Sequence, residues 1–297
     1  MNQEEFGRLL FSLRRERTSG IGRNFLSQEK FAETVNIAKV RYGRFEQGTR
    51  KPRIDELVRI AENLQLTSRE RQEFIIAGLE LDDEAFNKNM ANPNDVLDDL
   101  LLKMSEVRTP FIIFDSFATI IALNRTVIHF YSGKESVFNL AKQDPAYANY
   151  LNVLFSEHIP EARATLKDIE DDFLAMNIRF FRGITFRYRH MPFYDKIIKH
   201  LKQHKRFEKY WNKTLYLSND DYDFVRDNKI NHPFLGDIHF LRLISMTNTS
   251  AGPLYTLIYL PANDTTDLAF RNHLINTDNQ LMKVAQNWSW PEYMKQP

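Results

Sequence analysis

The sequence contains no cysteine among its 297 residues and only 10 glycines. The lack of cysteine excludes disulfides, thiolate zinc sites and cysteine nucleophiles, and it fits a reducing, intracellular setting. The scarcity of glycine leaves little room for phosphate-binding loops, and we find no Walker or dinucleotide-binding fingerprint. No apolar run reaches the ~18 residues that span a bilayer, and Glu4 and Glu5 stand where a signal peptide would be basic. We therefore expect a cytoplasmic protein with no membrane association.

Catalytic constellations are also missing from the sequence. There is no nucleophile elbow, and Asp171 and Asp172 are adjacent, so their side chains diverge instead of forming an acid/base pair. His200 and His204 are one helical turn apart and could share a metal, but a third ligand is missing, which favours surface histidines. We therefore expect no enzyme activity, no catalytic residue, no metal and no cofactor.

Positive charge is concentrated at the start of the chain, although the formal net charge is only +1. Residues 1–76 contain 15 Lys and Arg against 11 Asp and Glu, whereas residues 77–108 contain 3 against 8. A local basic excess is typical of nucleic-acid binding. The first segment is therefore the candidate for that function.

Residues 1–77 are predicted to form a domain of five short helices. Phe6, Leu9, Leu10 and Leu13 recur at helical spacing, with arginines that include Arg14 on the other face. Helix starts and ends are marked by Ser27 as an N-cap, Asn36 in a tight turn, Gly48 as a C-cap, Pro52 as a breaker, and Thr67 with Glu70 as a capping box.

The run from Ser27 to Pro52 resembles the Cro/repressor-type (XRE) helix-turn-helix, within a match that covers about 65 residues. The polar opening Gln28-Glu29, Ala32 at the helix contact and the Glu46-x-Gly48-x-x-x-Pro52 closure carry the resemblance. The resemblance implies DNA base contacts by Lys39, Val40 and Arg44, and DNA backbone contacts by Gln28, Arg41, Thr49 and Arg50. Two positions depart from the family pattern. Asn36 replaces the usual turn glycine, and Gly43 lies inside the recognition helix, where it costs roughly 1 kcal/mol against alanine and could allow a close approach to the DNA backbone.

Double-stranded DNA is the partner that this resemblance implies. A single helix-turn-helix buries little surface on DNA, and family members usually bind two half-sites as dimers. We therefore expect a homodimer. Residues 93–107 and the C-terminal tail are both candidates for the dimer contact.

Residues 108–262 are predicted to form an α+β domain, after a connector that contains a helix at residues 78–107. Residues 110–124 form two short strands around a turn, residues 126–213 show helical patterns, and residues 238–244 and 254–261 form further strands. Strands at both ends that enclose helices favour one mainly antiparallel sheet. Residues 263–297 are expected to be a C-terminal helix and tail.

This second domain resembles the PAS-like ligand-binding domain of MmyB-like transcription regulators. The resemblance is carried by Pro110 to Asn124, by Arg206-Phe207 to Trp211 and by His232-Pro233-x-x-Gly236, while Thr214 stands where the family usually has a histidine. It implies a fatty-acid-like ligand in the apolar interior. Candidate ligand residues are Phe114, Leu123, Arg182 and Trp211, and Arg179, Arg187 and Arg189 could also meet a carboxylate head.

The leading hypothesis is a sequence-specific DNA-binding transcriptional regulator whose C-terminal domain binds a small apolar effector that modulates operator binding. The alternative is a helix-turn-helix regulator controlled by a protein or peptide partner that binds the C-terminal domain. The third hypothesis is an enzyme with an N-terminal DNA-binding domain.

Overall fold

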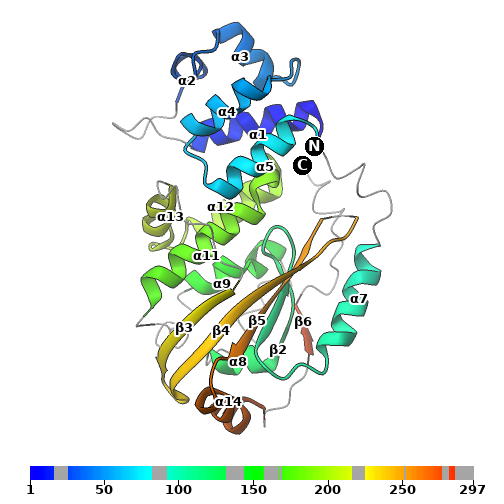
Figure 1. The fold of residues 1–297 in the computed structure, drawn as a ribbon, viewed down its shortest axis with the longest axis vertical. Coiled ribbons are helices and arrows are strands. Elements are labelled where there is room, and N and C mark those ends of the chain that lie inside the picture. The colour runs from blue at the N-terminus through cyan, green and yellow to red at the C-terminus, as the bar shows by residue number, and fades with distance from the viewer. Residues whose placement is uncertain are drawn as a thin grey trace.

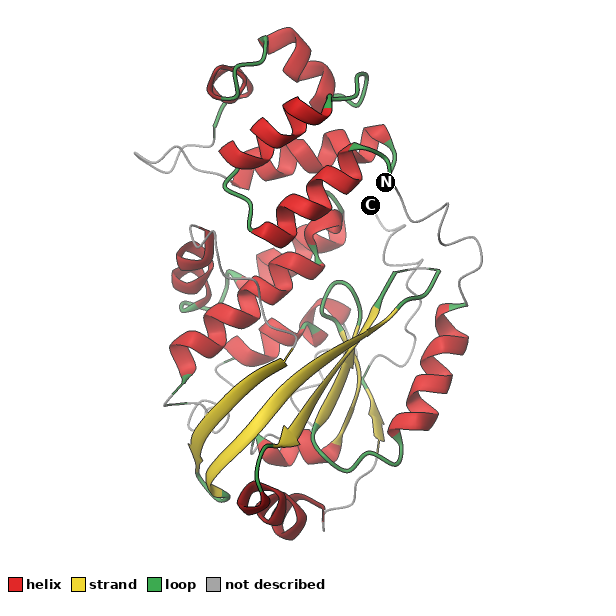
Figure 2. Ribbon diagram, viewed as in Figure 1, coloured by secondary structure: helices red, strands yellow, loops and turns green. Residues whose placement is uncertain are grey.

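The computed structural model describes residues 1–16, 26–81, 92–131, 144–156, 167, 169–215, 225–250, 252–275 and 281–284. These residues form an N-terminal helical region, followed by a region of helices around one sheet (Figures 1 and 2). Each region has its own hydrophobic core. The predicted fold class, an all-α domain followed by an α+β domain with an antiparallel sheet, is confirmed.

The described N-terminal region contains the five predicted helices: α1 (Gln3–Glu16), α2 (Gln28–Thr34), α3 (Lys39–Glu46), α4 (Ile54–Asn63) and α5 (Ser68–Gly78). The predicted start signals form. The Ser27 hydroxyl accepts a hydrogen bond from the Lys30 amide at 3.2 Å, and Thr67 and Glu70 make both bonds of a capping box. Asn36 has a φ of 52°, the left-handed conformation that lets the chain turn tightly between α2 and α3.

The second region contains a six-stranded sheet in which every neighbouring pair is antiparallel, in the order β3-β4-β5-β1-β2-β6. The strands are β1 (Phe111–Phe114), β2 (Ile120–Asn124), β3 (Val225–His232), β4 (Gly236–Thr247), β5 (Leu254–Pro261) and β6 (Leu281–Lys283). The described helical elements of this region are α7 (Pro93–Met104), α8 (Arg125–Phe130), η3 (Pro145–Ala148), α9 (Tyr150–Phe155), α11 (Glu170–Ile184), η4 (Phe186–Tyr188), α12 (Pro192–Leu201), α13 (Phe207–Leu215), α14 (Asp264–Phe270) and the π-helical turn η5 (Arg271–Ile275).

Helices pack against one face of this sheet. The ring of Phe114 on β1 stacks on Tyr150 of α9 and meets Phe180 of α11 edge-on, with ring centroids 5.8 and 5.6 Å apart. Figure 1 shows α11 and α12 between the sheet and the N-terminal helices. The helical middle of the region, predicted from apolar spacing, is therefore the layer that separates the sheet from the helix-turn-helix.

Two strands were not predicted from the sequence. β3 is an edge strand with few apolar residues, and only alternate side chains along it are buried, so its apolar signal is weak. β6 is three residues long and lies beyond residue 262, where we predicted only a helix and tail. A strand this short has little signal in its composition and forms through hydrogen bonds to a neighbouring strand. For β6, that neighbour is β2.

The boundaries of the second region are wider than predicted. Leu97, Leu101 and Met104 of α7 and Phe270 of α14 are buried in the same core as the sheet. The helix in the predicted connector and the helix after residue 262 therefore both belong to this region. The structure gives α7 a packing role, and the tail beyond residue 284, the other candidate for the dimer contact, lies outside the described residues.

The residues that carry the MmyB-like resemblance shape turns and strand ends. The Asp115 carboxylate accepts the amides of Phe117 and Thr119, both at 2.9 Å. The His232 ring lies 2.7 Å from the Phe130 carbonyl oxygen, and the Thr214 hydroxyl donates to the Trp211 carbonyl at 2.9 Å. These contacts give the motif residues structural roles, while the MmyB-like assignment itself stays a prediction.

Candidate nucleic-acid interface

The recognition helix α3 has one packed face and one free face. Tyr42 and Phe45 are fully buried in the N-terminal core. Lys39, Val40 and Arg44, the three predicted base contacts, are exposed, and the Val40 side chain is 69% exposed. An aliphatic side chain left this open on a helix is unusual unless it meets a partner. The structure therefore places the three predicted residues together on one accessible surface.

The end of α3 is held against α1 by a glycine. Gly48 has a φ of 66°, and a Cβ there would lie 2.6 Å from the Glu4 Cα. Real side chains do not tolerate such a distance to backbone, so this close approach requires glycine in addition to the left-handed conformation. The predicted C-cap therefore also sets the distance between the two helices.

A buried polar cluster fixes α3 to α1 and α2. The Arg14 guanidinium binds the Glu46 carboxylate through Nε at 2.6 Å and Nη2 at 3.0 Å, and the Gln28 amide donates to the same carboxylate at 2.8 Å. Burial alone would lower the pKa of Arg14, but its contacts with Glu46 raise it above the usual value, so the guanidinium keeps its charge. The prediction that Arg14 lies on the exposed face of the first helix is wrong, because Glu46 draws it into the domain.

Gly43 faces Gln28 on α2, inside the domain. A Cβ on Gly43 would lie 3.3 Å from the Gln28 side-chain oxygen, and Gly43 itself is buried. The missing side chain therefore gives Gln28 room to reach Glu46. The approach of Gly43 to the DNA backbone stays a prediction. The amide of Gln28, a predicted backbone contact, is already engaged within the protein.

The other predicted backbone contacts differ in their freedom. Arg41 pairs with the buried Glu56, with Nε at 2.6 Å from Oε1 and Nη2 at 3.0 Å from Oε2, so a phosphate would compete with that carboxylate. Burial would raise the pKa of Glu56, but the bonds from Arg41 and the Arg53 amide hold it below its usual value. Thr49 and Arg50 are exposed, and the Thr49 hydroxyl donates to the Arg44 carbonyl at 3.2 Å.

Two arginines at this surface have no ion pair with any residue that the structure describes: Arg44 and Arg50. Lys39 has a solvent-exposed pair with Glu29 at 3.0 Å, which contributes little and is easily exchanged. An uncompensated exposed guanidinium is suited to bidentate contact with guanine or to a phosphate. The surface around α3 therefore supplies the free positive charge that a DNA contact requires.

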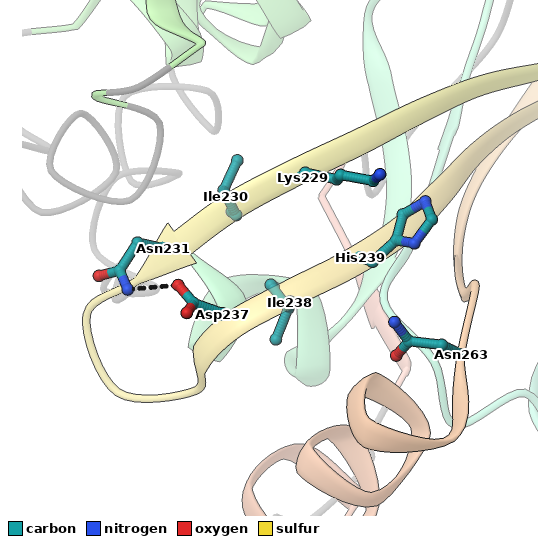
Figure 3. A pocket seen from close by; sticks show the side chains of 7 residues that line it. All are labelled: Lys229, Ile230, Asn231, Asp237, Ile238, His239 and Asn263. Carbon is teal, nitrogen blue, oxygen red and sulfur yellow. Dashed lines mark hydrogen bonds between the residues drawn. The ribbon is translucent and has the colours of Figure 1, made fainter.

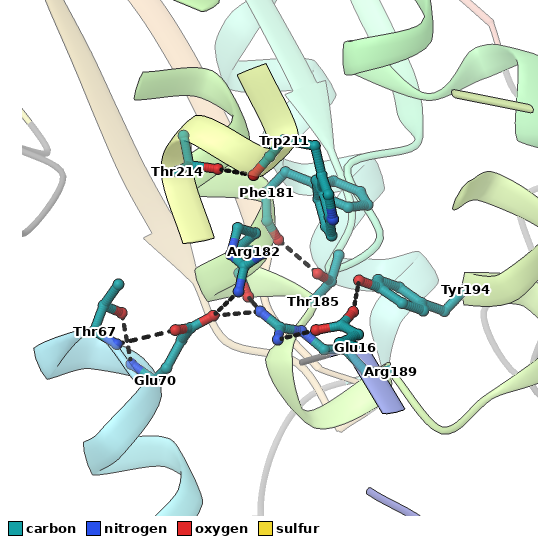
Figure 4. Close-up of polar contacts among 10 residues, drawn as sticks. All are labelled: Glu16, Thr67, Glu70, Phe181, Arg182, Thr185, Arg189, Tyr194, Trp211 and Thr214. Carbon is teal, nitrogen blue, oxygen red and sulfur yellow. Dashed lines mark hydrogen bonds and ion pairs between the residues drawn. The ribbon is translucent and has the colours of Figure 1, made fainter. Parts of the chain in front are cut away.

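A second arginine cluster joins the N-terminal region to the rest of the chain (Figure 4). Glu70 of α5 meets Arg189 at 2.5 Å and Arg182 of α11 at 3.2 Å through the same carboxylate oxygen. Arg189 also binds Glu16 of α1 at 3.0 Å, and the Tyr194 hydroxyl donates to Glu16 at 3.1 Å. We call Glu16, Glu70, Arg182, Arg189 and Tyr194 the docking cluster.

Burial makes the docking cluster strong. The side chains of Glu70, Arg182 and Arg189 are 1 to 2% exposed. Burial would raise the pKa of Glu70, but the charges of Arg182 and Arg189 outweigh it and lower that pKa to about 2. Apolar contact adds to the charges, because Phe186 of η4 is fully buried in the N-terminal core. The helix-turn-helix therefore packs on the second region through a specific, desolvated contact.

The predicted ligand residues lie in two separate settings. Arg182 binds Glu70, and its guanidinium lies 4.8 Å from the ring centroid of Trp211. Phe114 and Leu123 are buried on β1 and β2. Arg187 binds Glu73 of α5 at 2.6 Å. Three of the four arginines considered for a carboxylate head thus bind carboxylates of the N-terminal region. The sequence did not predict this role, because Glu70 was interpreted only as part of a helix cap.

Other features of the described residues add no catalytic or metal site. The pocket in Figure 3 lies beside the β3–β4 hairpin and the start of α14, and five of its seven lining residues are polar or charged. None of the predicted ligand residues lines it.

Within the described ranges, no three His, Asp or Glu side chains are grouped to hold a metal, and no helix is long and apolar enough to cross a membrane. His204 binds Asn152 at 2.6 Å, and His200 is largely buried beside Tyr147, so surface histidine was the wrong interpretation for His200.

Comparison with known proteins supports the interpretation of the N-terminal region. No curated protein matches the chain. Residues 26–70 match the family model for the helix-turn-helix, and this range contains α2, α3, α4 and the start of α5. The chain therefore carries a helix-turn-helix of the XRE type, a DNA-binding domain of transcriptional regulators.

Proposed function

We propose that this chain is a sequence-specific transcriptional regulator in which α3 reads the major groove and the C-terminal region controls operator binding through a small apolar effector. The observation that carries the DNA-reading part is the free face of α3, where Lys39, Val40 and Arg44 are exposed while the other face is locked into the core. A helix with this division fits the major groove, which is about as wide as one helix.

The chemistry of the free face assigns a role to each side chain. Arg44 and Lys39 donate to guanine O6 and N7, and Val40 packs on a thymine methyl. Arg50 and Thr49, just after α3, bind phosphates and set the position of the helix on the duplex. Arg41 binds a phosphate only where that phosphate displaces Glu56 or shares the Arg41 guanidinium with it.

Two copies bind one operator in this proposal. A single helix-turn-helix makes few base contacts, and dimers place two recognition helices about 34 Å apart on successive turns of one DNA face. Control then requires that the effector favours one placement of the two helices over another.

The docking cluster supports this route of control. It joins α5 and α1, which pack with α3 in one core, to α11, which packs on the sheet. An effector that binds in the C-terminal region and shifts α11 also moves Arg182. The position of the helix-turn-helix against the C-terminal region then changes. The apolar effector is supported by the aromatic interior of this region and by its resemblance to MmyB-like domains.

The DNA-reading part is tested by operator selection from random duplexes, followed by binding measurements on R44A, R50A and the control K213A, whose exposed side chain lies on α13. We expect R44A to lose about 1 to 3 kcal/mol of discrimination at one base position. R50A should weaken binding to all sequences and flatten the salt dependence by about 0.9 in the log–log slope. K213A should bind as wild type.

Equal effects of R44A and R50A on all sequences would contradict the division of roles. Failure to select any sequence would contradict sequence-specific binding. The control part is tested separately, by measuring operator affinity with and without a panel of apolar acids. An affinity unchanged by every acid would contradict control by such an effector.

A further inference from the structure

The buried face of the sheet contains an arginine where an apolar residue is expected. Along β4, Ile238, Phe240, Arg242 and Ile244 alternate toward the interior, and Arg242 is 3% exposed. Its guanidinium lies 5.4 Å from the ring centroid of Phe173 on α11. Arg242 is therefore enclosed between the sheet and the helix layer.

This guanidinium has no counter-charge in the described part of the chain. No described carboxylate pairs with Arg242, and its Nη1 atom is buried without a hydrogen-bond partner. A guanidinium stays protonated in proteins, and a buried charge without a partner costs several kcal/mol. The ring of Phe173 compensates part of that cost, because a cation is attracted to the face of an aromatic ring.

The neighbouring strand adds a second positive charge. The register of β3 and β4 places Arg226 directly opposite Arg242, so the two side chains start on the same face of the sheet. Like charges in this relation destabilise a sheet unless an anion joins them. Arg226 is partly exposed and likewise has no ion pair with a described residue.

The tyrosines around Arg242 do not neutralise it. Tyr259 on β5 is its other cross-strand neighbour, and Tyr131 lies close enough for its hydroxyl to bond that of Tyr259 at 2.8 Å. Burial raises the pKa of Tyr131, Tyr150 and Tyr259, so all three hydroxyls stay neutral. They supply neutral hydrogen-bonding groups and ring surface next to a positive charge.

Aromatic rings and one buried amide form the rest of the surroundings. Phe130 stacks on Tyr259 with ring centroids 5.4 Å apart and meets Phe240 at 5.5 Å. One helical turn after Phe173, Asn177 has a buried side-chain oxygen without a hydrogen-bond partner. A single buried positive charge, neutral hydroxyls and aromatic walls are together suited to an organic acid with one negative charge and an apolar body.

We propose that Arg242 binds the carboxylate of the effector, whose apolar body lies between α11 and the sheet. Arg182, which we had considered for this role, is occupied by Glu70. This inference rests on the proposed control by an apolar effector, and it names the residue that anchors the acid group of that effector. The site lies on β4 and faces α11, which carries Arg182 of the docking cluster.

The test compares acids with neutral molecules of the same shape on the purified full chain. Decanoate and decan-1-ol, and 4-phenylbutanoate and 4-phenylbutan-1-ol, are titrated by calorimetry into wild type, R242Q, R242K and R271Q. The control R271Q removes an arginine that is 67% exposed on the surface. We expect wild type and R271Q to bind at least one acid about tenfold more tightly than its alcohol, which corresponds to about 1.4 kcal/mol.

R242Q should lose that preference for the acid, while R242K, which keeps the charge, should retain it. Without ligand, R242Q should unfold at the same temperature as wild type or a higher one, because an unpaired buried charge has been removed. A lower unfolding temperature would show that Arg242 is a structural cation and would count against the proposal.

Three results would overturn the anchoring role: neither acid binds wild type, acid and alcohol bind alike, or R242Q binds the acid as tightly as wild type does. The comparison within wild type needs no variant, so it stands even where R242Q does not fold. Operator binding by R242Q without ligand is measured in parallel and should match wild type. Loss of DNA reading in R44A leaves acid binding unchanged, so failure of this inference is distinguishable from failure of the proposed function.

Discussion

The arginines around α3 and those of the docking cluster stand in opposite surroundings within one chain. Arg44 and Arg50 are exposed and have no described ion pair, whereas Arg182 and Arg189 are 1 to 2% exposed and share the carboxylate of Glu70. Exposed guanidinium groups gain little from local carboxylates and stay available for DNA. Buried ones bind their partners strongly, because water no longer competes. The same residue type therefore stays free at the surface where we propose DNA recognition, and attaches the two regions to each other at the other surface.

This contrast implies that the two sets respond differently to substitution. Loss of an exposed arginine should change binding and leave folding intact. Loss of a partner in the docking cluster should destabilise the folded chain, because it leaves an uncompensated buried charge. The four tests below proceed from the largest expected effect to the smallest.

Glu70→Gln should have the largest effect on stability. Glutamine can still make the capping-box bond to the Thr67 amide, so the substitution removes the charge and preserves the cap. We expect the free energy of unfolding to fall by about 3 to 5 kcal/mol, measured by urea denaturation of the full chain. The control E62Q changes an exposed glutamate on α4 and should stay within about 0.5 kcal/mol of wild type. Similar losses in both variants would contradict the special role of Glu70.

Acid should remove the same contribution. The folded-state pKa of Glu70 is about 2, below its usual 4.5, so its stabilisation is complete above pH 4.5 and is lost as the pH falls through 2. The difference in unfolding free energy between wild type and E70Q should therefore shrink over this interval. A difference that stays constant down to pH 2 would show that the carboxylate charge is not what holds the cluster.

Gly43→Ala offers a smaller test within α3. Alanine gains about 1 kcal/mol of helix propensity, but its Cβ presses on Gln28, which binds Glu46. We expect little net change in G43A, and a gain of about 1 kcal/mol when G43A is combined with Q28A and compared with Q28A alone. Denaturant unfolding of the four proteins measures both values. A clear loss of stability in the double variant would place the constraint on Gly43 elsewhere.

The smallest effects on folding should come from substitution of the two arginines that we propose as DNA contacts. R44A and R50A should each unfold within about 0.5 kcal/mol of wild type, although both weaken DNA binding. Thermal and urea unfolding without DNA provide the measurement. A large loss of stability in either variant would contradict the difference between exposed and buried arginines, because that arginine would then have a structural partner.

Much of the N-terminal region was predictable because its signals are local. Ser27, Thr67 and Glu70 bond backbone groups three residues away, and Asn36 turns its own backbone, so these roles follow from the local sequence alone. The exposed positions of Lys39, Val40 and Arg44 follow from the same helical period. The buried position of Arg14 could not be predicted in this way. Its partner Glu46 is 32 residues away in the sequence and binds this polar side chain inside the domain.

Periodicity, caps and turn signals were enough to predict the helix-turn-helix, the helical middle of the second region and the strands β1, β2, β4 and β5. Only the tertiary structure added β3 and β6 to the sheet, separated the free arginines from the docking cluster and left Arg242 enclosed without a carboxylate. The physical reason is that periodicity and caps report short-range backbone geometry. The role of an arginine depends on burial and on which carboxylate reaches it, and Arg189 finds Glu70 across 119 positions of the chain.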